Sequence, residues 1–113
     1  MFKPLLLLVF LAPAITAQPV ETQFACQTED SAKKIGASFV AGLEEGDQVA
    51  DSLVMTGACK YFGQKIYAYV VHRGPTFGTE FKVTVVGLSS RIGQNPEMWA
   101  VIATDQLRDD GTI

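Results

Sequence analysis

The sequence predicts an α+β fold, in which an N-terminal α-hairpin packs on a three-stranded antiparallel β-meander and one disulfide joins the two parts. Three observations lead to this prediction. Apolar residues between positions 32 and 54 recur at helical spacing, whereas the pattern after Tyr61 alternates with a period of two. The chain also has only two cysteines, Cys26 and Cys59, which lie on either side of the predicted α-hairpin.

The N-terminal segment, residues 1–17, predicts a secretory signal peptide. Lys3 precedes a leucine-rich run, and small residues follow at Ala14 and Ala17. The run is shorter than the roughly 20 apolar residues that a membrane-spanning helix needs, so we expect cleavage rather than anchoring. Cleavage after Ala17 makes Gln18 the first mature residue, and cleavage after Ala14 is the alternative.

Residues 18–113 are expected to form a single small domain that is mildly acidic. The whole chain has 9 basic and 12 acidic side chains, and loss of Lys3 with the signal peptide leaves 8 basic ones and a net charge of −4. Nucleic-acid binding requires clustered Lys and Arg side chains that neutralise phosphates, so we expect no nucleic-acid partner. The signal peptide predicts a secreted or periplasmic protein without stable membrane insertion after cleavage.

The cysteines predict a structural disulfide between Cys26 and Cys59. A lone cysteine pair in an exported chain reaches an oxidising compartment, where disulfides form and persist. On the chain-entropy account, closing a loop of this length stabilises the fold by about 3 to 4 kcal/mol. Two alternatives are disfavoured. A redox pair lacks the Cys-x-x-Cys spacing, and lipidation of Cys26 conflicts with Gln23 and Phe24, which stand where lipidation sites carry small or aliphatic residues.

Local signals predict an extended arm followed by a first helix. Residues 18–27 contain Pro19 and show no period, so we expect an extended arm that ends at Cys26. Thr28 is a suitable helix cap, and the acidic residues after it suit the positive end of the helix dipole. Gly46 is the predicted stop. The predicted buried stripe of this helix consists of Ala32, Ile35, Phe39, Val40 and Leu43.

A second helix is predicted after a cap at Asp47. The segment Gln48 to Thr56 is short, and its β-branched residues leave open whether it is helix or strand. We favour a helix because a hairpin of two helices returns the chain to its starting point, which brings Cys59 beside Cys26.

The clearest β-signal is a hairpin over residues 65–88. If residues 74–78 form its loop, the alternation of the strands directs Tyr67 and Tyr69 to the core face. The predicted cross-strand pairs on that face are Arg73 with Thr79, Val71 with Phe81, Tyr69 with Val83 and Tyr67 with Val85.

A third strand is predicted over Glu97 to Thr104, after a polar loop at 89–96 with turn-forming residues. Beyond it, Leu107 is expected to dock on the core and residues 109–111 to fray. The segment Trp99 to Leu107 resembles the last strand of small bacterial SH3-like domains, which also follows a β-meander. The likeness covers about nine residues and does not include the two predicted helices, so it assigns no family.

The sequence carries no recognisable catalytic or metal-binding motif. His72 is the only histidine, so it cannot supply the usual cluster of histidine ligands. Ser31 and Lys34 have the Ser-x-x-Lys spacing of penicillin-recognising enzymes, but the companion motifs are absent. The acidic clusters at 44–47 and 109–110 lack the alternating oxygen donors of a calcium loop. We therefore expect no cofactor and no metal site, and enzymatic activity is not the favoured prediction.

The second face of the predicted hairpin is more aliphatic than a solvated face requires. The predicted register sets His72 opposite Glu80 and leaves a candidate binding face that consists of Ile66, Val70, His72, Glu80 and Val86. The alternative for this face is that the sheet curls and closes a second small core beneath loop 89–96, filled by Trp99 or Met98.

The leading functional prediction is a small exported binding or accessory protein of unknown specificity, which acts by surface contact with a protein partner. One alternative is a small secreted hydrolase with a site built around His72 and Glu80, and another is a structural or envelope protein. Pairing of an edge strand with a partner or with a second copy is a further alternative. The sequence determines neither the identity of the partner nor the oligomeric state.

Overall fold

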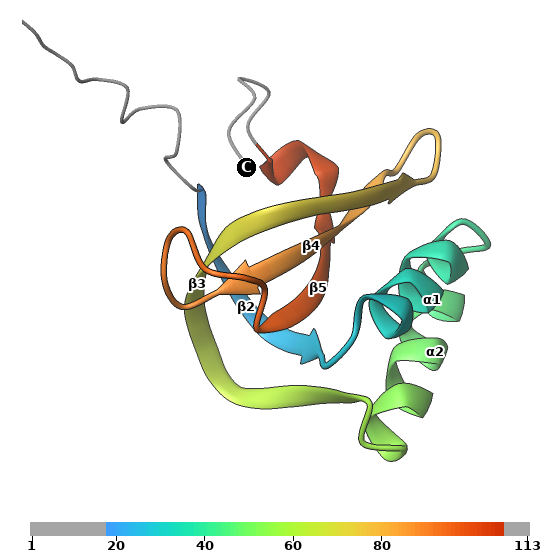
Figure 1. The fold of residues 1–113 in the computed structure, drawn as a ribbon. Coiled ribbons are helices and arrows are strands. Elements are labelled where there is room, and N and C mark those ends of the chain that lie inside the picture. The colour runs from blue at the N-terminus through green and yellow to red at the C-terminus, as the bar shows by residue number, and fades with distance from the viewer. Residues whose placement is uncertain (1–17, 108–113) are drawn as a thin grey trace, which may run out of the picture.

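The computed structural model describes residues 18–107, so the predicted signal peptide and the predicted fraying of residues 109–111 lie outside the described residues. Figure 1 shows the strands wrapped into a small barrel, with two helices side by side against one flank. The elements in chain order are strand β2 (Gln18–Cys26), helices α1 (Glu29–Phe39) and α2 (Leu43–Met55), strands β3 (Cys59–Phe77), β4 (Val83–Ser89) and β5 (Met98–Ala103), and the 3-10 helix η2 (Thr104–Gln106).

Four antiparallel strands form the sheet, one more than predicted. β2 pairs with β3 from Gln18, which lies opposite Val70, to Cys26, which lies opposite Cys59. β4 and β5 follow in chain order, and one pair among the described residues, Cys26 opposite Trp99, joins β5 back to β2 and closes the barrel. The α+β class is confirmed. The three-stranded meander is wrong, because the predicted N-terminal arm is itself a strand.

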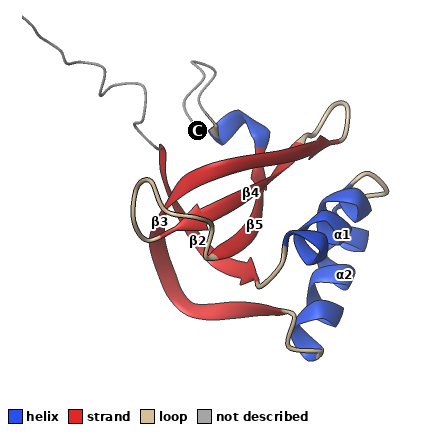
Figure 2. Cartoon of the chain, viewed as in Figure 1, coloured by secondary structure: helices blue, strands red, loops and turns tan. Residues whose placement is uncertain are grey.

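The α-hairpin lies between β2 and β3 in the chain, not ahead of the whole sheet as predicted. α1 packs on β4 and β5, and α2 packs on α1 and β3, so both helices cover one outer side of the barrel (Figure 2). The predicted disulfide between Cys26 and Cys59 is confirmed. The disulfide joins the end of β2, which precedes the α-hairpin, to the start of β3, which follows it.

The start of α1 is as predicted. The Thr28 side chain accepts a hydrogen bond from the Ser31 backbone N–H at 3.3 Å, and two acidic residues occupy the first turn. The helix ends earlier than predicted, at Phe39, and the chain turns at Gly42 with a φ of +152°. Val40 and Leu43 are consequently exposed rather than part of the buried stripe.

Gly46 does not stop a helix as predicted. It lies inside α2, and a Cβ atom added to it would collide with the Phe39 ring, so its lack of a side chain lets the two helices approach closely. The ambiguous segment Gln48 to Thr56 is helical through Met55. A hairpin of two helices therefore brings the chain back to Cys59, as expected.

The loop of the β3–β4 hairpin lies at residues 78–82, not at 74–78. β3 continues to Phe77, which lies opposite Val83, and Gly78 turns with a φ of +99°. Gly74 and Pro75, which predicted the loop, lie within β3 at a register shift between Arg73 and Thr76. A second register shift lies between Val70 and His72. The predicted cross-strand pairs are therefore wrong. Tyr67, predicted to face the core, is 74% exposed.

Apolar residues form two clusters, one inside the barrel and one between the helices and the sheet. Thr84 is buried, and its hydroxyl forms hydrogen bonds of 2.8 Å with the hydroxyls of Thr76 and Thr104. Leu107 docks on the barrel cluster, as predicted. The buried residues of the barrel cluster are Ala68, Val70, Val86, Leu88, Ala100, Ile102 and Leu107, and those of the helix cluster are Cys26, Ile35, Ala50 and Cys59.

Candidate functional site

Two residues of the predicted binding face lie in the core. Val70 and Val86 have no exposed area and belong to the barrel cluster, so their assignment to a surface is wrong. Ile66 is half-buried on β3. The sheet curls and closes a core on this face, with Met98 packed against it, which is the alternative predicted from the sequence.

The predicted pair of His72 with Glu80 is not formed. Both side chains are exposed, but His72 lies opposite Gly87, and Glu80 lies in the loop after β3. The His72 ring packs edge-on against Trp99 with 5.5 Å between ring centroids, and its Nε2 lies 3.9 Å from a carboxylate oxygen of Glu29. The grouping on which a hydrolase was predicted is therefore absent from the described residues.

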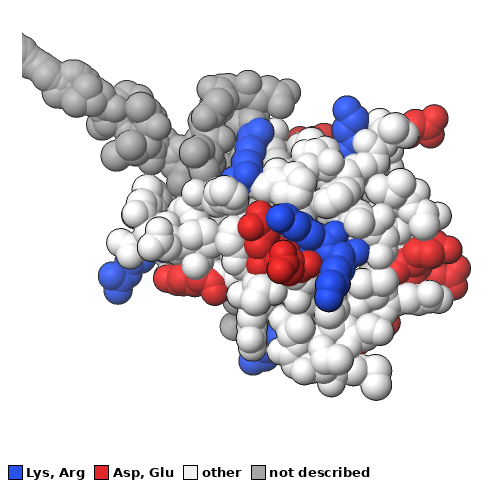
Figure 3. Space-filling view, turned by 45° about the vertical axis from the view of Figure 1, so that its right-hand side comes forward, with Lys and Arg blue, Asp and Glu red and all other residues white. Residues whose placement is uncertain are grey.

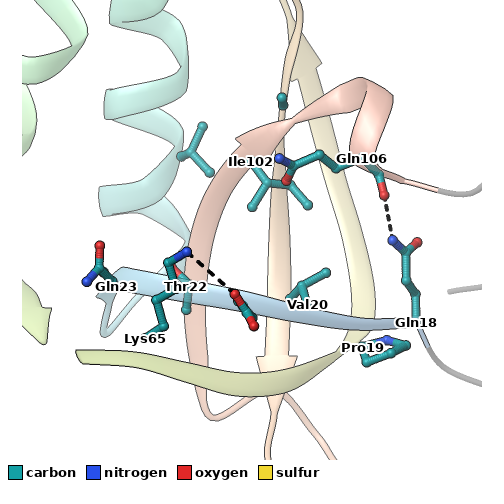
Figure 4. Close-up of a pocket in the computed structure, with 11 residues that line it drawn as sticks. Gln18, Pro19, Val20, Thr22, Gln23, Lys65, Ile102 and Gln106 are labelled. Carbon is teal, nitrogen blue, oxygen red and sulfur yellow. Dashed lines mark hydrogen bonds and ion pairs between the residues drawn. The ribbon is translucent and has the colours of Figure 1, made fainter.

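A cleft of about 600 Å³ lies between β2 and β5, where the two strands separate (Figure 4). Among the described residues, ladder pairing between these strands is limited to Cys26 and Trp99. At the other end of the cleft, the Gln18 side-chain amide donates a hydrogen bond of 2.5 Å to the backbone oxygen of Gln106. The cleft is thus bounded at both ends by links between β2 and the C-terminal elements.

The hydrogen bonds of β4 show how the backbone groups of the sheet are oriented. The Thr104 N–H donates to the Lys82 oxygen at 3.0 Å, and the Glu97 N–H donates to the Leu88 oxygen at 2.7 Å. Even-numbered residues of β4 therefore direct their backbone groups at β5. In an antiparallel sheet these groups alternate between the two sides along each strand, so Ser89 directs its own at β3.

The same alternation continues from β3 into β2. Tyr69 lies opposite Ser89 and faces β4, so its neighbour Val70 faces β2, where it lies opposite Gln18. The residues whose backbone groups face the cleft before the register shift between Thr22 and Phe24 are therefore Pro19 and Glu21 on β2, and those on β5 are Val101 and Ala103. Beyond the shift the sides exchange, because the Gln27 N–H donates to the Ala58 oxygen of the β3 side. Pro19, which has no N–H, occupies a position where this costs no hydrogen bond of the sheet.

Side chains give the cleft an apolar floor and a polar rim. Val20 and Ile102 project toward the cleft from the facing strands (Figure 4). At the rim, the Lys65 ammonium lies 3.7 Å from a carboxylate oxygen of Glu21. A hydrogen bond to Glu21, together with the negative charge of that carboxylate, raises the pKa of Tyr67. Glu21 thus interacts with two side chains of β3.

The cleft offers a binding surface without an assembled catalytic group. Thr22 is the hydroxyl residue among those that line it, and its Oγ1 accepts from the Phe24 N–H at 3.1 Å and donates to the Phe24 oxygen at 2.7 Å. Within residues 18–107, no group of three or more His, Cys, Asp or Glu side chains is placed to hold a metal ion. No helix in this part of the chain has the length and apolar character to cross a membrane.

Charge is mixed on the surface. The face in Figure 3 carries basic and acidic side chains beside one another near its centre and an acidic group at its right-hand side.

A more apolar hollow of about 500 Å³ lies beside the disulfide. It is lined by side chains of β3, Tyr61 and Phe62, and by Met98 of β5. The Tyr61 hydroxyl is 3.0 Å from an Asp51 carboxylate oxygen, and desolvation, followed by this hydrogen bond, raises the pKa of Tyr61.

Sequence reasoning missed the cleft because it missed β2. The signal for this strand was present, since Val20, Thr22 and Phe24 alternate with the polar residues Glu21 and Gln23. Pro19 and the two glutamines obscured that alternation. The separation of β2 from β5 has no local signal, because it depends on how the barrel closes.

No protein family, curated protein or solved structure matches this chain.

Proposed function

We propose that this chain is a small exported binding protein that acts by surface contact with another protein, and that the cleft between β2 and β5 is its contact site. The observation that carries the proposal is the pair of strand edges that face each other across about 600 Å³. An open strand edge is a row of backbone donors and acceptors that another polypeptide can pair with. The cleft thus replaces the predicted face around Val70 and Val86 as the surface to test.

One feature supports export. The disulfide between Cys26 and Cys59 suits an oxidising compartment, where such bonds form and persist.

Binding is favoured over catalysis because the charged and hydroxyl groups of the cleft already have partners. Glu21 is paired with Lys65, and the Thr22 hydroxyl is bonded to the Phe24 backbone. A hydrolytic site requires a nucleophile or an activated water beside a base. That grouping is absent from the residues that line the cleft in the described part of the chain.

The test compares the amounts of partner proteins that are captured by the wild type and by a variant whose cleft is blocked. Gln23→Trp places a large ring on an exposed residue that lines the cleft. Mature wild-type protein, this variant and a control are immobilised and exposed to the exported protein fraction of the source cells, and retained proteins are quantified by mass spectrometry. We expect a partner that the wild type retains at least about tenfold better than the blocked variant.

The matched control is Gln64→Trp. Gln64 is also an exposed glutamine on a strand, but it lies outside the residues that line the cleft. Thermal unfolding of each variant shows that the fold is kept. Equal retention of every partner by Gln23→Trp and Gln64→Trp would contradict the proposal.

A further inference from the structure

The cleft has the backbone chemistry of a sheet from which one strand is missing. On β2, Glu21 directs both N–H and C=O groups at the cleft, and Pro19 directs a C=O group. On β5, Val101 and Ala103 do the same from the other side. Such groups, repeated at every second residue, match the backbone of an extended polypeptide and not a compact small molecule.

We propose that the ligand of the cleft is an extended segment of a partner protein that adds to the open edge of β2 and runs antiparallel to it. This inference rests on the proposed function and names the kind of partner. The antiparallel direction relative to β2 follows from the greater stability of antiparallel pairing per residue. Because β2 and β5 are themselves antiparallel, the added segment runs parallel to β5.

The boundaries of the cleft set the length of the segment. At one end the Thr22 hydroxyl bonds both the N–H and the C=O of Phe24, and pairing of β2 with β5 begins at Cys26. At the other end the bond from Gln18 to Gln106 links the two sides. The open stretch from Pro19 to Gln23 spans about 17 Å at about 3.3 Å per residue, which suits a segment of about five residues.

The floor and the rim set the side chains of the segment. Val20 and Ile102 provide an apolar floor, so inward positions should carry small apolar residues such as Val or Ala. Outward positions lie beside the ion pair of Glu21 with Lys65 and should be polar. No aromatic side chain lines the cleft among the described residues, so it offers no stacking platform of the kind that favours a sugar or a base.

The test combines peptide selection with amide hydrogen exchange. A phage-displayed library of peptides about seven residues long is selected on the full mature protein, with Gln23→Trp as the counter-selection. We expect peptides with alternating small apolar and polar residues. In the complex, exchange of the Glu21 amide should slow at least about tenfold, while the Val20 and Thr22 amides, which already face β3, should not change.

Backbone pairing is then tested on the best selected peptide, without changing any side chain. Two versions of the peptide are made. One carries N-methyl groups on the odd-numbered amides, and the other carries them on the even-numbered amides. At least one version should lose binding at least about tenfold, because N-methylation removes the donor that pairs with β2. Parental affinity of both versions, or unchanged exchange of the Glu21 amide, would overturn strand addition.

Other outcomes also decide the question. Failure to select any peptide in preference to Gln23→Trp overturns the proposal, even where capture of a partner still depends on the cleft and the proposed function stands. Protection of the Glu21 amide in the free protein that disappears on removal of residues 108–113 would assign the cleft to the chain's own C-terminal segment. Protection that rises with protein concentration would assign it to a second copy, and both of these results overturn the proposal.

Discussion

Cys26 and Trp99 lie opposite each other at the ladder pair that closes the barrel, and the Cys26 sulfur is also bonded to Cys59 on β3. One residue therefore joins three strands at the place where the α-hairpin leaves the sheet. The cleft opens immediately beyond this pair, next to the register shift between Thr22 and Phe24. The paired part and the open part of the junction between β2 and β5 are thus adjacent, and each can be tested separately.

Replacing both Cys26 and Cys59 by Ala should lower the free energy of unfolding by about 3 to 4 kcal/mol on the chain-entropy account. The disulfide joins residues separated by 33 positions, so its loss frees a long loop of the unfolded chain. Equilibrium unfolding in urea measures the change. Reduced wild-type protein is the control and should match the double variant. An unchanged free energy would show that the disulfide does not stabilise the fold.

Val70→Ala should destabilise the protein by about 1.5 to 3 kcal/mol, because Val70 has no exposed area and its truncation leaves a cavity in the barrel. Val40→Ala makes the same chemical change on a side chain that is 63% exposed, and it should alter stability by less than about 0.5 kcal/mol. Urea unfolding of both variants gives the comparison. Similar costs at the two positions would argue against the closed barrel.

Gly46→Ala should destabilise the α-hairpin by about 1 to 3 kcal/mol, although alanine favours a helix, because the new methyl group would collide with the Phe39 ring. Gly63 in β3 is the matched control, since a Cβ atom added there meets nothing within 4 Å. Gly63→Ala should therefore be neutral or slightly stabilising. Thermal unfolding of the two variants tests this, and an equally stable Gly46→Ala variant would refute the close helix contact.

Glu21→Gln should lower the pKa of Tyr67 toward its ordinary value of about 10, because the hydrogen bond to Glu21 and the charge of Glu21 raise it. A raised pKa means that folding favours the protonated hydroxyl. This contribution to stability is present below the ordinary pKa and is lost as the pH rises through the raised value. NMR titration of the tyrosine rings measures the shift.

Asp51→Asn is the matched control for that titration. It removes the negative charge of Asp51, which acts after desolvation and together with the hydrogen bond to raise the pKa of Tyr61, and it leaves only a neutral amide oxygen as acceptor. The variant should therefore lower the pKa of Tyr61 and leave that of Tyr67 unchanged. A change at Tyr67 in this control would mean that the two tyrosines do not titrate independently.

Features that depend on neighbouring residues could be read from the sequence. Thr28 caps α1 because a threonine hydroxyl before acidic residues accepts from the first turn. The disulfide followed from two cysteines, a predicted signal peptide and a hairpin length that returns Cys59 to Cys26. The α+β class followed from the change of hydrophobic period. None of these inferences required knowledge of how distant strands meet.

Features that depend on strand pairing and barrel closure were decided only by the tertiary structure. Two register shifts in β3 keep Gly74 and Pro75 inside the strand and place the hairpin loop beyond Phe77. Tyr67 consequently lies opposite Glu21 of β2, away from its predicted partner Val85, and is exposed. Closure of the sheet then buried Val70 and Val86, which the linear pattern placed on a surface. The cleft itself arises where β2 and β5 separate beyond the pair of Cys26 with Trp99. No local run of residues specifies the separation of these two strands.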